Sequence, residues 1–148
     1  MGPPEVDLFA STTGTDSDWV VKLIDVYPND VPEAASQGAK PSMAGYELAI
    51  GIEIFRGRYL KSFAQPSALE PGKVAHYSWK LPNVDHVFRP GHRIMVQVQS
   101  TLFPLYDRNP QTYVDNIMYA KKNDYKKATQ SIWFGGANAS SVVLPVVQ

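Results

Sequence analysis

Apolar and polar residues alternate with a period of two in several separate segments of the chain, and this period predicts β-strands. Residues 46–54 place an apolar side chain at every second position: Tyr46, Leu48, Ile50, Ile52 and Ile54. Residues 74–81 repeat the pattern with Ala75, Tyr77, Trp79 and Leu81, and residues 94–99 repeat it with Ile94, Val96 and Val98. Each segment is predicted to be a strand with one face on a core and one face toward water.

Residues 18–27 are apolar on both faces, which is typical of a central strand that is covered on both sides. Residues 6–11 and 142–146 are two more predicted strands. Turn residues such as Glu70-Pro71-Gly72 and Arg89-Pro90-Gly91 stand where the alternation stops. Two packed antiparallel sheets, an all-β sandwich, account for this pattern.

Two stretches lack the alternation. Residues 28–44 are rich in Pro, Ala, Ser and Gly and are predicted to form an exposed loop. Residues 101–136 form a long irregular region, in which 113–129 carries a weak helical stripe that allows a short helix. Long structured loops on a rigid sandwich often serve function.

Length and charge narrow the class of protein. The 148 residues fit one compact domain spanning 1–148, and the formal net charge is zero, with 14 basic and 14 acidic residues. No long-range field therefore favours nucleic acid or an anionic membrane, and we expect neither as a partner. The absence of cysteine excludes disulfides, thiolate metal sites and a cysteine nucleophile.

Catalytic and cofactor motifs are absent from the sequence. It contains no Gly-x-Ser-x-Gly nucleophile elbow, no phosphate-binding glycine loop and no His-Glu-x-x-His zinc motif. Asp16 and Asp18 have oxygen ligands that calcium accepts, but short acidic residues after Thr13-Gly14 are also what a turn favours, and we favour the turn. We therefore expect no catalytic residue, no metal and no cofactor in this chain.

The three histidines have structural interpretations. His76 falls on the outward face of its strand and is predicted to be solvated. His86 and His92 flank the Pro90-Gly91 turn, where a ring nitrogen that bonds to the backbone is favoured over catalysis. Tyr59, Tyr77 and Trp79 could form an aromatic platform for a sugar or a peptide, although Tyr77 and Trp79 share the apolar phase of a predicted core.

Four segments resemble one known family: residues 11–28 (STTGTDSDWVVKLIDVYP), 55–59 (FRGRY), 87–100 (VFRPGHRIMVQVQS) and 103–110 (FPLYDRNP). They resemble the C-terminal domain of the X-Pro dipeptidyl-peptidase family, which also holds cocaine esterase and the α-amino acid ester hydrolases. The resemblance covers nearly the whole chain in the expected order, and it is closest to the α-amino acid ester hydrolase and glutaryl acylase branch.

The resemblance implies a jelly-roll β-sandwich of galactose-binding-like shape, belonging to a parent enzyme that is secreted or periplasmic. Its partner would be an α/β-hydrolase domain of the same polypeptide, in which a serine attacks an ester or amide carbonyl. This domain would stabilise that enzyme and shape its substrate entrance, without a catalytic residue of its own. The alternative function is an independent carbohydrate- or ligand-binding module.

The resemblance also suggests which residues face the catalytic domain. The segment with Phe103, Pro104, Asp107, Arg108 and Asn109 is similar to the family segment that lies at the interdomain contact, and Arg56 and Arg58 are candidates for the same contact. Pairing of Arg108 with Asp107 inside the loop is an equal alternative.

Family members usually begin this domain with a further strand, upstream of a segment like Gly2-Pro3-Pro4. We therefore expect a jelly roll without its first strand, and an unpaired edge that recruits another chain as an edge-strand homodimer.

Overall fold

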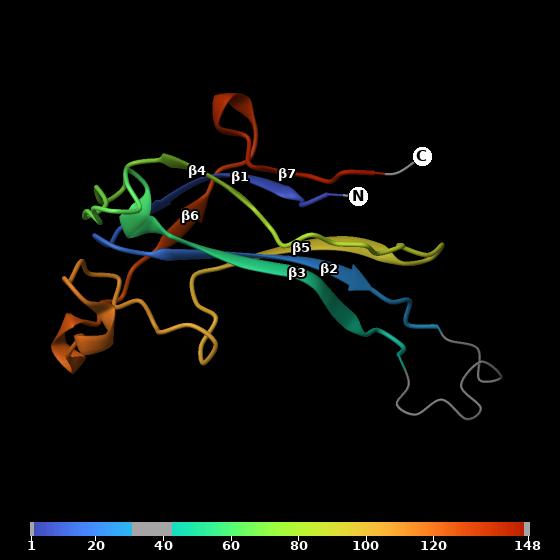
Figure 1. Cartoon of the computed structure of the whole chain (residues 1–148), viewed down its shortest axis with the longest axis horizontal. Coiled ribbons are helices and arrows are strands. Elements are labelled where there is room, and N and C mark those ends of the chain that lie inside the picture. The colour runs from blue at the N-terminus through green and yellow to red at the C-terminus, as the bar shows by residue number, and fades with distance from the viewer. Residues whose placement is uncertain (1, 31–42, 147–148) are drawn as a thin grey trace.

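The fold is all β, as predicted. The computed structural model describes residues 2–30 and 43–146 and contains two antiparallel sheets, drawn as two layers in Figure 1. The strands are β1 (Glu5–Thr12), β2 (Asp18–Val26), β3 (Glu47–Arg56), β4 (Ala75–Lys80), β5 (Arg93–Gln99), β6 (Gln130–Ile132) and β7 (Ser141–Val143). Four 3-10 turns join them: η1 (Gly57–Tyr59), η2 (Ile117–Tyr119), η3 (Lys122–Asp124) and η4 (Gly136–Asn138).

One sheet is built around β1 and the other around β2. Strand β1 pairs with β4 along one edge and with β6 and β7, one after the other, along its second edge. Strand β2 lies between β3 and β5, so β3 and β5 end the described part of that sheet. The sandwich prediction is confirmed, and the both-faced apolar pattern of 18–27 marks the central strand.

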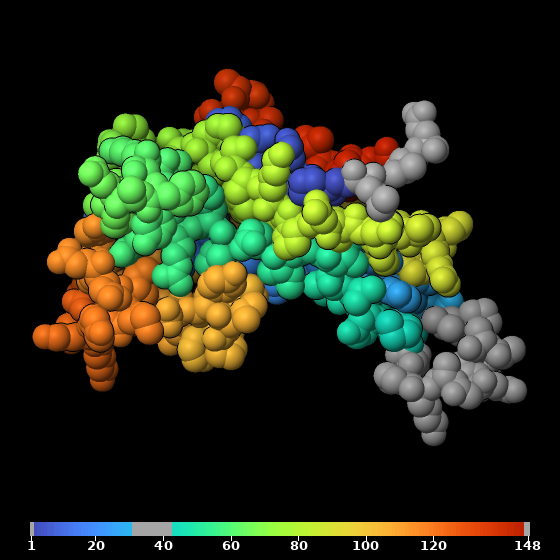
Figure 2. All heavy atoms as spheres, viewed as in Figure 1, coloured from blue at the N-terminus to red at the C-terminus, as the bar shows by residue number. Residues whose placement is uncertain are grey.

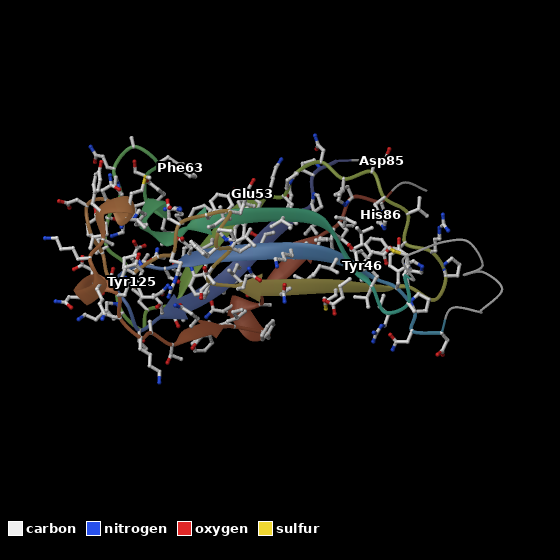
Figure 3. The ribbon with its side chains drawn as sticks, turned by 90° about the horizontal axis from the view of Figure 1, so that it is seen from below. Tyr46, Glu53, Phe63, Asp85, His86 and Tyr125 are labelled. Atoms are coloured by element: carbon white, nitrogen blue, oxygen red, sulfur yellow. The ribbon has the colours of Figure 1, made fainter. Side chains whose placement is uncertain are left out.

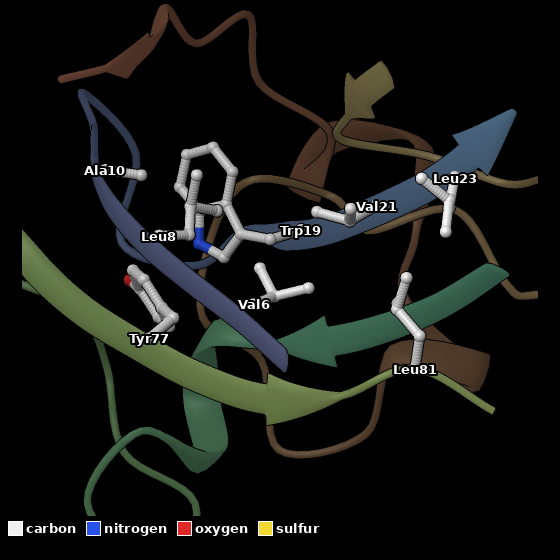
Figure 4. Packing of buried hydrophobic residues seen from close by; sticks show 8 residues of the cluster. All are labelled: Val6, Leu8, Ala10, Trp19, Val21, Leu23, Tyr77 and Leu81. Atoms are coloured by element: carbon white, nitrogen blue, oxygen red, sulfur yellow. The ribbon is translucent and has the colours of Figure 1, made fainter. Parts of the chain in front are cut away.

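The core lies where the inner faces of β1, β2 and β4 meet. Its buried cluster, shown in Figure 4, consists of Val6, Leu8, Ala10, Trp19, Val21, Leu23, Tyr77 and Leu81. Trp19 and Tyr77 are 1% exposed and their rings lie 5.7 Å apart, and Trp79 packs against the same cluster. Tyr77 is therefore a core residue and no platform for a sugar, as the apolar phase indicated.

The inward phase expected for 46–54 is wrong beyond Ile50. The pairing of β2 with β3 shifts register between Leu23 and Ile24, and a one-residue shift turns the following side chains to the other face. Past the shift, Phe55 packs against the core cluster, whereas Ile52 and Ile54 pair with Lys22 and Val20.

The irregular regions also differ from expectation. The short helix allowed in 113–129 is replaced by the single 3-10 turns η2 and η3, because the apolar stripe there is too weak to bury one face of an α-helix. The region 101–136 is interrupted by β6, which pairs with β1. The predicted loop 28–44 lies mostly outside the described residues, and the predicted strand 142–146 is the shorter β7.

No helix among residues 2–30 and 43–146 has both the length and the apolar character to cross a membrane.

Candidate functional site

The irregular segment 100–129 forms a lobe of two neighbouring loops that projects from one side of the sheets toward one end of the sandwich (Figures 1 and 2). Its outer side chains are apolar and exposed: Phe103 is 65% exposed, Leu105 73%, Met118 74% and Tyr119 81%. We call these four residues, together with the neighbouring exposed residues Pro104, Asp107 and Arg108, the loop surface. Five of its members lie in the segment 103–110 that carries part of the resemblance, whereas Met118 and Tyr119 lie outside the four segments that resemble the family.

A buried ion pair anchors this lobe to the sandwich. Arg58, which is 3% exposed, donates to Asp16 Oδ2 from Nε at 2.9 Å and from Nη2 at 2.6 Å. Nη2 also donates to the carbonyl oxygen of Val114 at 2.8 Å, and the guanidinium lies 4.9 Å from the ring centroid of Tyr113. One arginine thus joins the turn before β2 to the loop at 113–114.

A second buried carboxylate holds the loop at Asn109. Asn109 Nδ2 donates to Asp18 Oδ1 at 3.0 Å, and its Oδ1 accepts from the backbone N–H of Gln111 at 2.8 Å. Arg56 lies between two carboxylates, with Nε 3.9 Å from Asp18 Oδ2 and Nη2 4.0 Å from Asp107 Oδ2.

The environment of Asp18 disfavours its charge. Burial raises the pKa of Asp18 from 3.8 to about 6, although the hydrogen bond from Asn109 and the charge of Arg56 both lower it. The two neighbouring carboxylates therefore have different partners. Asp16 is in direct contact with a guanidinium, while Asp18 has an amide and a more distant arginine.

The seven residues suggested by the resemblance divide into two groups. Arg58 and Asn109 are buried and hold the loop in place, whereas Phe103, Pro104, Asp107 and Arg108 are on the loop surface. Arg56 is partly exposed and connects the two groups. The described residues do not show Asp107 and Arg108 paired with each other: Asp107 Oδ2 lies 4.0 Å from Arg56 Nη2, and Arg108 lies 5.7 Å from the ring centroid of Tyr125.

The Thr15-Asp16-Ser17-Asp18 segment is a structural anchor. Asp16 Oδ1 accepts from the Ser17 N–H at 2.9 Å, and its other oxygen is bound by Arg58. Among the described residues, no three His, Asp or Glu side chains are grouped as metal ligands. Asp16 thus accepts one local backbone hydrogen bond, and both carboxylates bind side chains from distant segments.

The hydrogen-bond partner expected for His86 and His92 is wrong. Both rings bind the buried carboxylate of Asp25 instead of the backbone: His86 Nε2 is 2.8 Å from Oδ2, and His92 Nδ1 is 2.9 Å from Oδ1. Burial raises the pKa of Asp25, but the hydrogen bonds from His86 and His92 outweigh it and hold that pKa below its ordinary value. His76, in contrast, is exposed as predicted and pairs with Asp7.

This histidine cluster is far from the loop surface. Figure 3 places Asp85, His86 and Tyr46 at one end of the molecule and Tyr125 and Phe63 at the other. The cluster ties the loop between β4 and β5 to the end of β2, and Tyr27 packs on His92 with ring centroids 4.3 Å apart.

We expect Asp25→Asn to lower the free energy of unfolding by about 1–3 kcal/mol, because two hydrogen bonds to a buried charged group are weakened. Urea denaturation of the chain near neutral pH measures it. The matched control is Asp7→Asn, which removes the exposed partner of His76 and should cost less than about 1 kcal/mol. Equal losses in the two variants would contradict a structural role for the cluster.

Comparison with known proteins agrees with this architecture. A family model described as the X-Pro dipeptidyl-peptidase C-terminal non-catalytic domain matches residues 1–143. Cocaine esterase of Rhodococcus sp. (strain MB1 Bresler) is 32% identical over 147 residues, which is 99% of this chain and 23% of that protein.

Two solved structures are similar in fold and in sequence. An α-amino acid ester hydrolase has a TM-score of 0.90 and 53% identity, over 99% of this chain and 23% of that one. An aminopeptidase from the marine sediment archaeon Thaumarchaeota archaeon has a TM-score of 0.88 and 52% identity, over 96% of this chain and 22% of that one. The chain thus spans about a quarter of the length of these relatives.

Proposed function

Because the chain belongs to the family of X-Pro dipeptidyl-peptidase C-terminal non-catalytic domains, we propose that it serves a longer serine hydrolase as a docking domain. In this proposal the loop surface packs on the catalytic domain, stabilises it and forms part of the wall of its substrate entrance. The parent enzyme hydrolyses an ester or amide bond, as the names of the relatives indicate for those proteins.

The observation that carries the proposal is a rigidly mounted apolar surface. Phe103, Leu105, Met118 and Tyr119 are between 65% and 81% exposed on one lobe. Clusters of large exposed apolar side chains are typical of interaction sites. The lobe has no α-helix or strand, only the 3-10 turns η2 and η3, and the buried hydrogen bonds of Arg58 and Asn109 hold it on the sandwich.

The chemistry of the described residues suits a supporting role. The buried ion pair Asp16–Arg58 and the buried contacts of Asp25 with two histidines are internal and lie near opposite ends of β2. Neither is next to a serine with the flanking glycines of a nucleophile elbow, which the sequence lacks. We therefore propose that the chain alone does not hydrolyse esters.

Hydrolysis of a p-nitrophenyl ester tests this directly. We expect activity in the full-length parent enzyme and none in the purified chain. Activity of the chain that survives repurification would overturn the proposal, because it would require a nucleophile within these residues.

A matched pair of variants tests the loop surface in the full-length enzyme. Leu105→Lys places a charge in the proposed contact, and we expect a lower temperature of thermal inactivation and higher sensitivity to proteases. Val143→Lys is the control, because Val143 is 55% exposed on β7, away from the lobe. Equal behaviour of the two variants would contradict docking through the loop surface.

A further inference from the structure

The sheet of β3, β2 and β5 has more apolar surface than the core covers. Strand β5 was predicted to bury Ile94 and Val96, but they are 53% and 43% exposed, so that prediction is wrong for both residues. Residues 18–27 are apolar on both faces, and the core covers only the face that carries Trp19 and Val21. The opposite face, which we call the outer face of the sheet, points away from the core.

The lobe covers one end of this outer face. Asp18, at the start of β2, has the same phase as Lys22 and is bound by Asn109 of the lobe. Its cross-strand neighbour Arg56 lies 4.0 Å from Asp107 of the lobe. Figure 1 shows the lobe on this side of the sheet, and Figure 3 views the molecule from below, with β3, β2 and β5 in front. The loop surface is therefore continuous with the rest of the outer face.

Lys22 lies in the middle of the outer face, four residues beyond Asp18. Its neighbours on β2 are Val20 and Ile24, which are 0% and 3% exposed, and its cross-strand neighbours are Ile52 and Gln97. The side chain of Lys22 is half-buried and forms no hydrogen bond or ion pair with any residue that the structure describes. A cation that is partly withdrawn from water among apolar side chains is unfavourable until a counter-charge reaches it.

The side chains around Lys22 suit a protein partner that supplies one acidic group. Ile52, Ile54 and Met95 are half-buried, so they offer apolar contact area but no carboxylate. A second copy packed through the same face would add another lysine and no counter-charge. The catalytic domain, which the loop surface contacts in the proposed function, is the partner next to this face.

We propose that the outer face of the β3-β2-β5 sheet continues the docking surface, and that Lys22 forms an ion pair there with an aspartate or glutamate of the catalytic domain. This inference rests on the proposed function, since it requires the longer enzyme. The ion pair would fix the position of one domain on the other, because complementary charges set the register of an interface.

Charge reversal at Lys22 tests the contact in the full-length enzyme. Lys22→Glu places two carboxylates face to face among apolar side chains, and we expect thermal inactivation to become faster by about tenfold or more. Lys22→Arg keeps the charge and should behave like the unsubstituted enzyme. Lys80→Glu, on the other sheet, is the matched control and should change the rate far less, because its pair with Glu5 is exposed. Equal rates for the two reversals would overturn the proposal.

The purified chain distinguishes a contact between domains from a loss inside this one. Because Lys22 has no ion pair within the described part of the chain, Lys22→Glu should lower the urea midpoint of the chain no more than Lys80→Glu does. A larger loss for Lys22→Glu in the chain alone would place its effect inside the domain and overturn the proposal.

Carbodiimide cross-linking of the full-length enzyme identifies the partner, because the reagent condenses an ammonium and a contacting carboxylate into an amide without a spacer. We expect mass spectrometry of the digest to show Lys22 joined to an aspartate or glutamate of the catalytic domain. Lys80 and Glu5, whose side chains lie 3.1 Å apart, are the internal control and should be joined in the same sample. Lys22 joined to a second copy of the chain, or unlinked while the control pair is joined, would contradict the proposed ion pair.

Leu105→Lys, on the loop surface, separates this inference from the proposed function. If Leu105→Lys speeds inactivation while Lys22→Glu behaves like Lys80→Glu, the domain docks through the loop surface alone and the inference is wrong. If only Lys22→Glu has an effect, the loop surface is wrong and the outer face of the sheet is the docking site.

Discussion

Replacing Arg58 with methionine should lower the free energy of unfolding of the chain by about 3–5 kcal/mol, because it leaves the Asp16 carboxylate buried without its counter-charge. Asp16 is 0% exposed and Arg58 is 3% exposed, so water cannot replace the lost partner. The carbonyl oxygen of Val114 loses its donor in the same step. Methionine keeps much of the volume of the side chain, so the loss is mainly electrostatic.

Urea denaturation near neutral pH measures this loss, and two variants interpret it. The double variant Asp16→Asn with Arg58→Met should be more stable than Arg58→Met alone, since it removes the uncompensated charge. Arg56→Met is the matched control: Arg56 is partly exposed and 3.9 Å from Asp18, and its loss should cost less than about 1 kcal/mol. A double variant no more stable than the single one would show that the loss comes from packing.

Loss of the Asp16–Arg58 pair should also loosen the loop surface. Because Arg58 joins the turn before β2 to residues 113–115, we expect hydrogen exchange in 110–120 to rise more in Arg58→Met than in the sheets. That result would show that the buried pair positions the exposed apolar residues of the lobe, although the pair itself does not contact the catalytic domain.

The sequence predicts the strands well because their signal is local. The both-faced apolar run of 18–27 is the central strand β2, and the alternation at 74–81 has the correct phase, with Tyr77 and Leu81 buried. The alternation at 46–54 fails after Ile50 because a register shift depends on the neighbouring strand. Ile94 and Val96 have the same local pattern as Val98, so only the arrangement of the sheets distinguishes them.

The anchoring side chains could not be paired from the sequence. Arg58 lies 42 positions from Asp16, and His86 and His92 lie 61 and 67 positions from Asp25. Nothing in the spacing of these residues indicates which of the 14 acidic residues each one meets. The resemblance suggested Arg56, Arg58 and Asn109 as contact residues, but burial is what distinguishes an internal anchor from an exposed side chain.

The second large effect that we expect is a loss of stability with rising pH, caused by Asp18. Its pKa is about 6 in the folded chain and 3.8 as the ordinary value, so the folded state holds the proton more tightly than the unfolded state. The stabilisation is therefore complete below about pH 4 and is lost as the pH rises through 6, with a total of about 3 kcal/mol. The side chain of Asp18 is 2% exposed, so solvent screening is small.

Asp18→Asn isolates this effect, because its amide oxygen still accepts from Asn109 but cannot ionise. We expect the free energy of unfolding of this variant to be nearly flat between about pH 4 and pH 7, and to exceed that of the parent chain at pH 7. Asp25 does not interfere, because its pKa is lowered and its contribution to stability is lost only below the ordinary value of 3.8.

Asp107→Asn, at a side chain that is 53% exposed, is the matched control. Its free energy of unfolding should fall with rising pH as steeply as that of the unsubstituted chain. Two outcomes would contradict the prediction: an unsubstituted chain whose free energy of unfolding does not fall between pH 4 and pH 7, or an Asp18→Asn variant whose free energy of unfolding falls equally. Either outcome would mean that Asp18 is charged in the folded chain near neutral pH, with Arg56 as its counter-charge.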